Sequence, residues 1–206
     1  PIAIVRRAPD SPQREWLAAR WGLIPRWAKG IDPRFSMINA KSETVFEKPA
    51  FRQAIKSQRC LIPADGFYEW KKEGKHKQPF FFHLQSGQPF AFAGVWEEWQ
   101  GPDAPILSCS ILTTNANAVV APCHDRMPVL LPAEAHALWL DPQVQDPAIL
   151  RPLLQPYPAE SMTSHPVSPL IGKTTNDGPA WIEKSQPTSS HSTPDLPLPI
   201  QPSLFD

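Results

Sequence analysis

The chain has 206 residues (23.0 kDa), of which 41% are hydrophobic and eight are tryptophan, enough apolar surface for the core of one domain. Basic and acidic residues cancel overall, but residues 1–84 carry 16 Lys and Arg against 8 Asp and Glu, and residues 85–206 carry 4 against 12. No apolar run approaches the roughly 20 residues that span a bilayer, no signal sequence opens the chain, and three cysteines without paired or metal-type spacing argue against a disulfide framework and structural zinc. We therefore expect a cytosolic protein without structural zinc. We also expect it to act as a monomer and to need neither a metal nor an organic cofactor.

The first half of the chain predicts mainly strands. Residues 2–5 and 16–24 are short apolar runs of strand type, and Pro25 closes the second. Residues 49–57 begin with proline and place apolar side chains at helical spacing, which predicts a short helix. A series of strands separated by prolines and glycines is then predicted at 60–70, 79–84, 90–96 and 106–113.

The second half adds helices at the edge of this sheet. Residues 132–140 read as an amphipathic helix, and 147–155 as another, which tolerates Pro152 poorly in its interior. A last strand is predicted at 164–168. The sum is an α+β single domain over residues 1–184, built on a mixed, largely antiparallel, partly closed β-sheet with peripheral helices.

Residues 185–206 differ in composition, with five Pro, five Ser and no Lys or Arg, which predicts a disordered tail. Its end carries Gln201, Leu204 and Phe205, which resemble the bacterial sliding-clamp-binding pentapeptide of Gln, two variable residues, Leu and Phe. Because short motifs recur by chance, a plain disordered terminus stays open beside a clamp-binding tail.

One acidic residue, Glu69, lies within an aromatic strand. Phe67, Tyr68 and Trp70 are strong strand formers, and a turn is predicted just after them at Glu73-Gly74. A carboxyl group among aromatic side chains loses hydration, which raises its pKa and suits it to proton transfer near neutrality.

Positive charge gathers next to this acid, because four Lys and one His follow within residues 71–77. Together with the excess of basic residues in the first half of the chain, this favours a nucleic-acid face. The alternative is that the two oppositely charged halves neutralise each other across one fold.

Four segments read in order resemble the SOS response-associated peptidase (SRAP) family of abasic-site-processing proteins. They are residues 21–27 (Trp-Gly-Leu-Ile-Pro-Arg-Trp), 39–44 (Asn-Ala-Lys-Ser-Glu-Thr), 64–70 (Ala-Asp-Gly-Phe-Tyr-Glu-Trp) and 124–128 (His-Asp-Arg-Met-Pro). The likeness runs from Trp21 to about Gly178. It implies binding of single-stranded DNA at abasic sites and a covalent protein–DNA link that shields the lesion.

The resemblance implies a catalytic Glu at Glu69, an active-site His at His124 and a positioning Asn at Asn39. An abasic sugar is mostly a closed hemiacetal, so an acid must protonate the ring oxygen before a nucleophile can attack the aldehyde. Glu69 suits that step, His124 could share the proton transfers, and Asn39 could hold an oxygen or amine without titrating. Taken singly, Glu69 also reads as a strand carboxylate paired with a lysine, and His124 as a turn residue bonded to Asp125.

The resemblance also implies contacts with DNA. Lys41 and Arg126 fall at positions that face phosphates, Thr113 fits a further backbone contact, and Pro25 belongs to the same set. Trp27 could stack on a base beside the lesion, which is indifferent to base identity. Phosphate contacts would position the strand without reading its sequence.

The start of the chain departs from the family. The family nucleophile is a Cys exposed after Met removal, whose α-amine and thiol trap the aldehyde as a thiazolidine, whereas this chain begins Pro1-Ile2-Ala3-Ile4. We expect a truncated sequence that lacks a few dozen residues including the nucleophile, so that it binds DNA without crosslinking. Iminium formation at Pro1 is the weaker alternative.

Two rival functions remain at this point. A cysteine peptidase-like hydrolase would use Cys60 or Cys123 with His124. Neighbouring side chains such as those of Cys123 and His124 diverge in extended backbone, and a buried thiol is inert. A noncatalytic single-stranded DNA binder would use the basic groove and Trp27 without a reaction.

Overall fold

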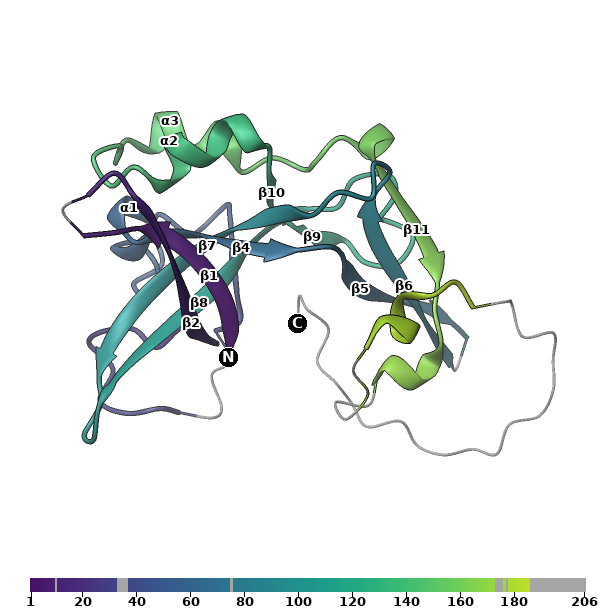
Figure 1. The fold of residues 1–206 in the computed structure, drawn as a ribbon, viewed down its shortest axis with the longest axis horizontal. Helices are drawn as coiled ribbons and strands as arrows, with labels where there is room; N and C mark the ends of the chain where they lie inside the picture. Colours follow the sequence, from purple (N-terminus) through teal and green to yellow (C-terminus); the bar gives the residue numbers. More distant parts are fainter. Residues whose placement is uncertain (10, 33–36, 75, 173–175, 177, 186–206) are drawn as a thin grey trace.

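The computed structural model describes residues 1–9, 11–32, 37–74, 76–172, 176 and 178–185. Two sheets lie side by side, a barrel-like sheet and a smaller three-stranded sheet, and α2 and α3 run along one side of the barrel (Figure 1). Gln201, Leu204 and Phe205 lie outside the described residues, so the disordered tail and its clamp motif stay predictions. Within the described residues no helix is long and apolar enough to cross a membrane.

Five strands of the larger sheet form a closed ring. They are β1 (Ile2–Arg7), β2 (Arg14–Trp21), β4 (Arg59–Ala64), β7 (Phe90–Gln100) and β8 (Pro105–Asn115). β1 pairs antiparallel with β2 and β4, β4 pairs with β7, and β7 pairs with β8. The parallel pairing of β2 with β8 completes the ring. The predicted mixed, partly closed sheet is therefore confirmed.

Three short strands extend this sheet, and none was predicted from the sequence. β3 (Asn39–Lys41) runs parallel to β8, β9 (Arg126–Pro128) runs antiparallel to β8, and β10 (Leu130–Leu131) runs antiparallel to β7. Each has two or three residues and becomes a strand only through pairing with a long strand. For β3 and β10 that long strand is distant in sequence, whereas β9 follows β8 after a loop. β3 and β9 bring the segments that carry Asn39 and Arg126 to the same long strand.

The smaller sheet has the order β11-β6-β5 and contains β5 (Phe67–Glu73), β6 (His76–Leu84) and β11 (Met162–Pro166). β5 and β6 form an antiparallel hairpin, and the predicted turn is confirmed, with Gly74 at φ 63°. That left-handed conformation is one that glycine adopts without strain. The last strand, predicted at 164–168, begins and ends two residues earlier.

The predicted single strand at 60–70 is wrong, because it divides between β4 in the barrel and β5 in the smaller sheet. The break falls at Asp65-Gly66. A Cβ at Gly66 would lie 2.1 Å from the Phe81 ring and 2.7 Å from the Phe82 carbonyl oxygen, so only glycine fits there. The close approach of the chain to β6 at Gly66 is what carries it from one sheet to the other.

The helices are shorter than predicted. The expected helix at 49–57 forms only α1 (Ala54–Ser57), because a series of turns occupies the residues before it. The one at 132–140 divides into η1 (Ala133–Ala135) and α2 (His136–Leu140). The one at 147–155 divides into α3 (Pro147–Leu150) and η2 (Arg151–Leu153), as the interior Pro152 leads one to expect. Three further 3₁₀ turns are η3 (Ala159–Ser161), η4 (Pro169–Gly172) and η5 (Pro179–Ile182).

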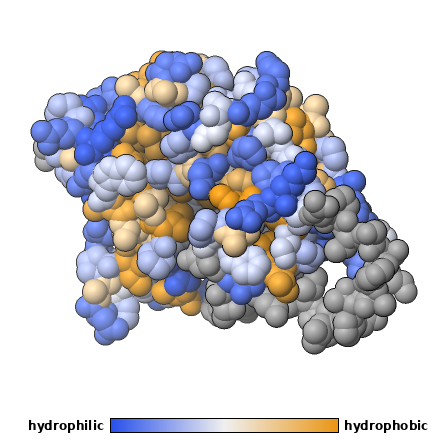
Figure 2. All heavy atoms as spheres, turned by 45° about the vertical axis from the view of Figure 1, so that its right-hand side comes forward, coloured by the Kyte–Doolittle hydropathy of each residue, from blue (hydrophilic) through white to orange (hydrophobic). Residues whose placement is uncertain are grey.

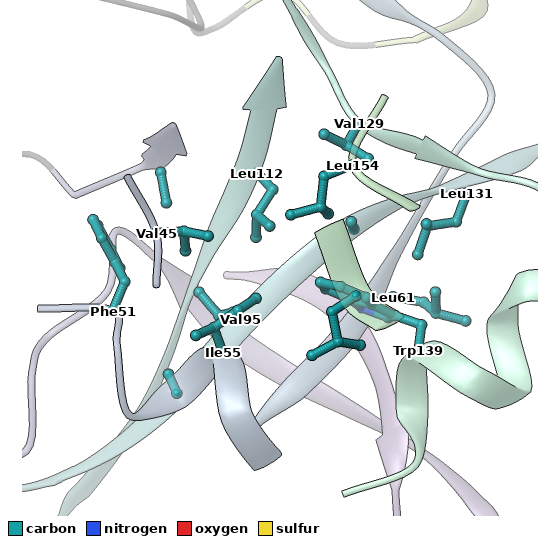
Figure 3. Close-up of a cluster of buried hydrophobic side chains, with 14 of the residues drawn as sticks. Val45, Phe51, Ile55, Leu61, Val95, Leu112, Val129, Leu131, Trp139 and Leu154 are labelled. Carbon is teal, nitrogen blue, oxygen red and sulfur yellow. The ribbon is translucent and has the colours of Figure 1, made fainter. Parts of the chain in front are cut away.

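The barrel strands separate two hydrophobic clusters, because alternate side chains of a strand point to opposite faces. On β7, Ala93 and Val95 belong to one cluster and Phe92 to the other. Figure 3 shows the first cluster, in which Ile55 of α1 and Trp139 of α2 pack against Leu61 and Leu112 of the barrel. The second cluster lies between the barrel and the smaller sheet and includes Cys60, Phe67, Phe82, Ile111 and Met127. The candidate site borders this second cluster.

Candidate functional site

Glu69 lies in the middle of β5 and is only 1% exposed. Its side chain shares a face with Phe67, and in the hairpin it stands opposite Phe80. The Phe67 and Phe82 rings stack nearby with centroids 5.2 Å apart. The expected placement, a carboxyl group on an aromatic strand with Phe67 on its own face, is confirmed. A carboxyl group so shielded from water suits proton transfer.

Asn39 begins β3 and stands opposite Ile111 of β8. Its amide nitrogen and its amide oxygen are both buried, and neither has a hydrogen-bond partner within the described residues. Buried amides nearly always have partners, since an unmet buried polar group costs about 1–3 kcal/mol. Ile111 belongs to the same hydrophobic cluster as Phe67, two residues before Glu69, so the amide and the acid border one cluster.

His124 lies in the loop between β8 and β9, and its side chain is 20% exposed. The backbone N–H of Arg126 donates to its Nδ1 over 2.9 Å. A neutral imidazole has one accepting and one donating nitrogen, so this hydrogen bond leaves the proton of neutral His124 on Nε2. An oxygen of Asp125 lies 3.0 Å from the same Nδ1 and would pair with a protonated ring. His124 is thus prepared to donate through Nε2.

The three thiols are held protonated at neutral pH. Burial raises the pKa of Cys60 well above its usual range and that of Cys109 to about 12. Burial also raises the pKa of Cys123 to about 11, and the negative charge of Glu69 contributes to that rise. Cys123 packs against the cluster that contains Phe67, so β5 and the loop before His124 come together. Because a thiolate is the reactive form, these cysteines do not favour a thiol hydrolase.

A second polar group surrounds Arg126, which starts β9. Its Nη1 and Nη2 donate to the two carboxylate oxygens of Glu43 over 2.8 and 3.0 Å. Nη2 also donates to the carbonyl of Thr113 over 2.7 Å, and Nη1 to the side chain of Asn115 over 3.2 Å. Lys41 stands opposite Thr113 in the sheet and is exposed. Lys41, Thr113 and Arg126 are therefore brought together, but the Nη groups of Arg126 are already engaged, so its phosphate contact stays a prediction.

Trp27 and Pro25 lie elsewhere. Pro25 is buried, and its carbonyl accepts the N–H of Ala28 in a turn that leaves Trp27 63% exposed. The Ala28 carbonyl accepts a hydrogen bond from Trp99, which stands opposite the beginning of β8. The Arg126 group lies at Thr113 and Asn115, toward the other end of β8, about 25 Å further along. The contacts predicted for Trp27 and Pro25 stay predictions, and a DNA strand would have to follow β8 to meet both groups.

The basic run after Glu69 is at the tip of the hairpin. Lys72 stands directly opposite Lys77, and both are exposed. Lys71 forms an ion pair with Glu73 over 3.2 Å. Figure 2 shows apolar residues at the surface in patches between hydrophilic ones, and the exposed large apolar side chains include Trp16 and Trp27. Within the described residues no three His, Cys, Asp or Glu side chains group as a metal site would require.

Glu43 is the residue that the sequence analysis missed. It lies within the 39–44 segment that carries Asn39, but 83 residues separate it from Arg126. The hydrogen bonds from Arg126 hold the pKa of the Glu43 carboxyl below its ordinary value. The only signal in the sequence was an acidic residue close to Asn39, and nothing in it indicated the partner.

Comparison with known proteins gives a consistent result. The family model described as SOS response associated peptidase (SRAP) matches residues 1–174. The chain is 48% identical over 166 residues to the abasic site processing protein YoqW of Bacillus subtilis, which covers 80% of this chain and 74% of the relative. It is 46% identical over 166 residues to the abasic site processing protein YoaM of the same organism, and this alignment covers 80% of this chain and 73% of YoaM. A crystal structure of a protein from Bacteroides thetaiotaomicron superimposes with a TM-score of 0.78 at 28% identity, covering 89% of this chain and 81% of the other.

Proposed function

The chain belongs to the SOS response associated peptidase (SRAP) family, and from this premise we propose that it processes abasic sites in single-stranded DNA. The observation that carries the proposal is the Asn39 amide, which is buried without a partner in the described structure and borders the same cluster as the buried acid Glu69. A sugar hydroxyl and ring oxygen would supply both the acceptor and the donor that the amide lacks. Relatives named abasic site processing proteins support this substrate.

Glu69 is proposed as the general acid and base. In the acid form its carboxyl protonates the ring oxygen of the closed sugar as the C1–O bond breaks, and the resulting Glu69 carboxylate takes the proton of the C1 hydroxyl, which forms the aldehyde and restores the acid. His124 donates a hydrogen bond from Nε2 to the oxygen of the opened hydroxyl, and the hydrogen bond that its Nδ1 accepts from the Arg126 backbone holds the ring in place. Asn39 holds the sugar without titrating, so it can act at any stage of the reaction.

Capture of the aldehyde requires a nucleophile. We propose the α-amine and thiol of an N-terminal Cys, as the family resemblance implies. The amine condenses with the aldehyde and releases water to form an imine, and the thiol then adds to the C=N carbon to close a thiazolidine. Cys60, Cys109 and Cys123 do not fit this role, because burial raises the pKa of each thiol.

The DNA strand is proposed to follow β8. At one end the exposed Lys41 would contact a phosphate, beside Thr113, which is 2% exposed and accepts from Arg126. At the other end Trp27 would stack on a base, with Pro25 supporting its turn. Such contacts would bind without regard to sequence. We also propose that the protein acts as a monomer at the nucleoid of a bacterial cytoplasm.

A denaturing gel tests the reaction. Single-stranded DNA with one abasic site is incubated with this chain and with the same chain preceded by the family's N-terminal segment beginning with Cys. We expect a heat-stable adduct only from the extended chain. An adduct from both would overturn the proposed nucleophile, and no adduct from either would overturn abasic-site crosslinking.

The competing function is a noncatalytic single-stranded DNA binder. Glu69→Gln distinguishes the two, because the amide keeps the size of the side chain but cannot supply the proton. Glu73→Gln is the matched control, since Glu73 lies on the same face of β5 but is exposed at the tip of the hairpin. If Glu69→Gln alone loses the reaction with abasic sites, and both variants still bind DNA, the result supports an enzyme over a noncatalytic binder.

The tail is proposed as a separate tether. A peptide of residues 198–206 should bind a bacterial sliding clamp through Gln201, Leu204 and Phe205, and should lose binding when Leu204 and Phe205 are replaced by Ala. A peptide that does not bind, or that binds equally well after both replacements, would exclude this role and leave residues 185–206 as a plain tail.

A further inference from the structure

The Glu43–Arg126 pair has the geometry of a fixed clamp. The guanidinium and the carboxylate meet through two parallel hydrogen bonds of 2.8 and 3.0 Å. This side-on arrangement fixes orientation as well as distance, unlike a single contact between flexible charged groups. The Arg126 side chain is 10% exposed and that of Glu43 is 46% exposed, so Glu43 lies on the solvent side of the guanidinium.

Further hydrogen bonds tie the same guanidinium to the barrel. Nη2 donates to the Thr113 carbonyl over 2.7 Å and to its hydroxyl over 3.2 Å, and Nη1 donates to Asn115 over 3.2 Å. Both Nη groups therefore have acceptors. Glu43 is the only acidic side chain among these partners, so within the described residues it makes the one ion pair of the Arg126 guanidinium.

The backbone of Arg126 in turn touches the site. Its N–H donates to Nδ1 of His124 over 2.9 Å. That N–H points at the imidazole only while residue 126 keeps its place at the start of β9, where it stands opposite Asn115. The side chain of Arg126 helps to hold residue 126 in this position through its hydrogen bonds to Glu43 and Thr113. Arg126 thus connects its ion pair with Glu43 to the nitrogen of His124 that carries the proton.

We propose that Glu43 is a positioning residue, which by clamping the Arg126 guanidinium holds the residue 126 N–H on His124 Nδ1 and so keeps the imidazole proton on Nε2. This inference rests on the proposed function, because it assigns the clamp to the histidine that donates to the opened sugar. Glu43 itself does not touch the sugar. Its effect passes through the backbone of Arg126, two residues after His124.

Nitrogen NMR of the histidine rings tests the proposal in the DNA-free protein as it stands. The His124 signals are assigned by their loss in His124→Gln. In the unsubstituted chain we expect the shifts of an accepting Nδ1 and a protonated Nε2. In Glu43→Ala we expect both nitrogens to move toward the average of the two tautomers. Glu47→Gln is the control, since Glu47 is 72% exposed, lies 3.8 Å from Arg151, and should leave the His124 ring unchanged.

The reaction rate gives the second readout, measured as adduct formation by the chain extended with the family's N-terminal segment. General acid catalysis contributes roughly 100-fold or more, so a partly misplaced proton should slow the Glu43→Ala reaction about tenfold. Glu43→Gln, which keeps one of the two hydrogen bonds, should lie between, and it replaces Glu43→Ala if that variant does not fold. Unchanged His124 shifts in a folded Glu43 variant would overturn the proposal, as would shifted signals with an unchanged rate.

The two proposals fail in different ways. If the unsubstituted extended chain forms no adduct, the proposed function fails, whatever the histidine ring does. If it forms the adduct but His124 keeps its tautomer in the Glu43 variants, the clamp is a purely structural ion pair and the proposed function is untouched.

Discussion

Asn39 and Arg126 lie on the two short strands that flank the end of β8, yet their hydrogen bonding is opposite. All the Nη groups of Arg126 have acceptors in Glu43, Thr113 and Asn115, and only its Nε lacks a partner. The Asn39 amide has no partner for either its nitrogen or its oxygen within the described residues. A polar group satisfied by the protein holds the structure, whereas a buried one left unsatisfied is suited to a ligand. Under the proposed function, we call the group around Arg126 the holding part of the candidate site, and Asn39 with Glu69 its reacting part.

The largest effect is expected in the reacting part, at Glu69. Glu69→Gln should slow the abasic-site reaction of the extended chain by about 100-fold or more, because a positioned proton donor is lost while the side-chain volume is kept. Single-turnover adduct formation at saturating protein measures it. Binding to single-stranded DNA should stay within twofold, as it should for Glu73→Gln. A rate within a few-fold of the unsubstituted protein would remove Glu69 from the reaction.

In the holding part the effect should be on stability. Arg126→Met leaves the Thr113 carbonyl and the Glu43 carboxylate without their charged donor, which should lower the free energy of unfolding by about 2 kcal/mol. Denaturant unfolding measures it. Arg151→Met is the control, because Arg151 is 46% exposed and 3.8 Å from Glu47, and its loss should cost less than about 1 kcal/mol. Equal costs would contradict the holding role of Arg126.

Two exposed tryptophans allow a test of the proposed DNA contact. Trp27 is 63% exposed in the loop near the beginning of β8, and Trp16 is 68% exposed on β2. Trp27→Ala should weaken binding to single-stranded DNA by about 2 kcal/mol, since stacking on a base contributes roughly 1–3 kcal/mol. Trp16→Ala should leave binding unchanged. Fluorescence anisotropy with a short oligonucleotide compares them, and an equal loss in both would argue against specific stacking by Trp27.

The strands that the sequence predicts well are those with their own apolar run and their own turn. The β5–β6 hairpin is one, because aromatic residues flank Glu73-Gly74 on both sides. The break at Gly66 could not be foreseen, since the contact that forbids a side chain there comes from Phe81 in the next strand. β3 has only three residues and exists through parallel pairing with β8, about 70 residues later. Such pairings depend on the whole fold.

The sequence also indicated part of the candidate site. The resemblance pointed to Asn39, Glu69 and His124, and the structure places Asn39 and Glu69 at one hydrophobic cluster, with His124 next to Cys123, which packs against it. Neither pattern nor resemblance indicated that Glu43 pairs with Arg126, or that a backbone N–H sets the His124 tautomer. These contacts join residues whose side chains meet only after β3 and β9 have paired with β8.

For Asn39 we expect opposite effects of one substitution on stability and on activity. Asn39→Leu removes two unmet buried polar atoms, so it should raise the free energy of unfolding by about 1 kcal/mol while it weakens the abasic-site reaction. Asn117→Leu is the matched control. The Asn117 amide donates to the Tyr157 carbonyl over 2.8 Å and accepts from Val119 and Val120, so its removal should destabilise the protein. Destabilisation of both variants to the same extent would place Asn39 in the holding part.

The smallest effect concerns the pH dependence of the Glu43 clamp. Its hydrogen bonds from Arg126 hold the folded-state pKa of Glu43 below the ordinary value of 4.5. A depressed carboxyl pKa stabilises the fold above the unfolded value, and that stabilisation is lost as the pH falls through the lower folded value. Glu43→Gln should therefore be less stable than the unsubstituted chain at about pH 7, by under about 1 kcal/mol because the carboxylate is half exposed. The difference between the two should shrink as the pH falls below the ordinary value and vanish only once the pH lies below the lowered folded-state pKa, where Glu43 is protonated in both folded and unfolded chains. Urea unfolding at several pH values measures it, and a difference that stays constant down to the lowest pH would show that the charge of Glu43 contributes nothing to the clamp.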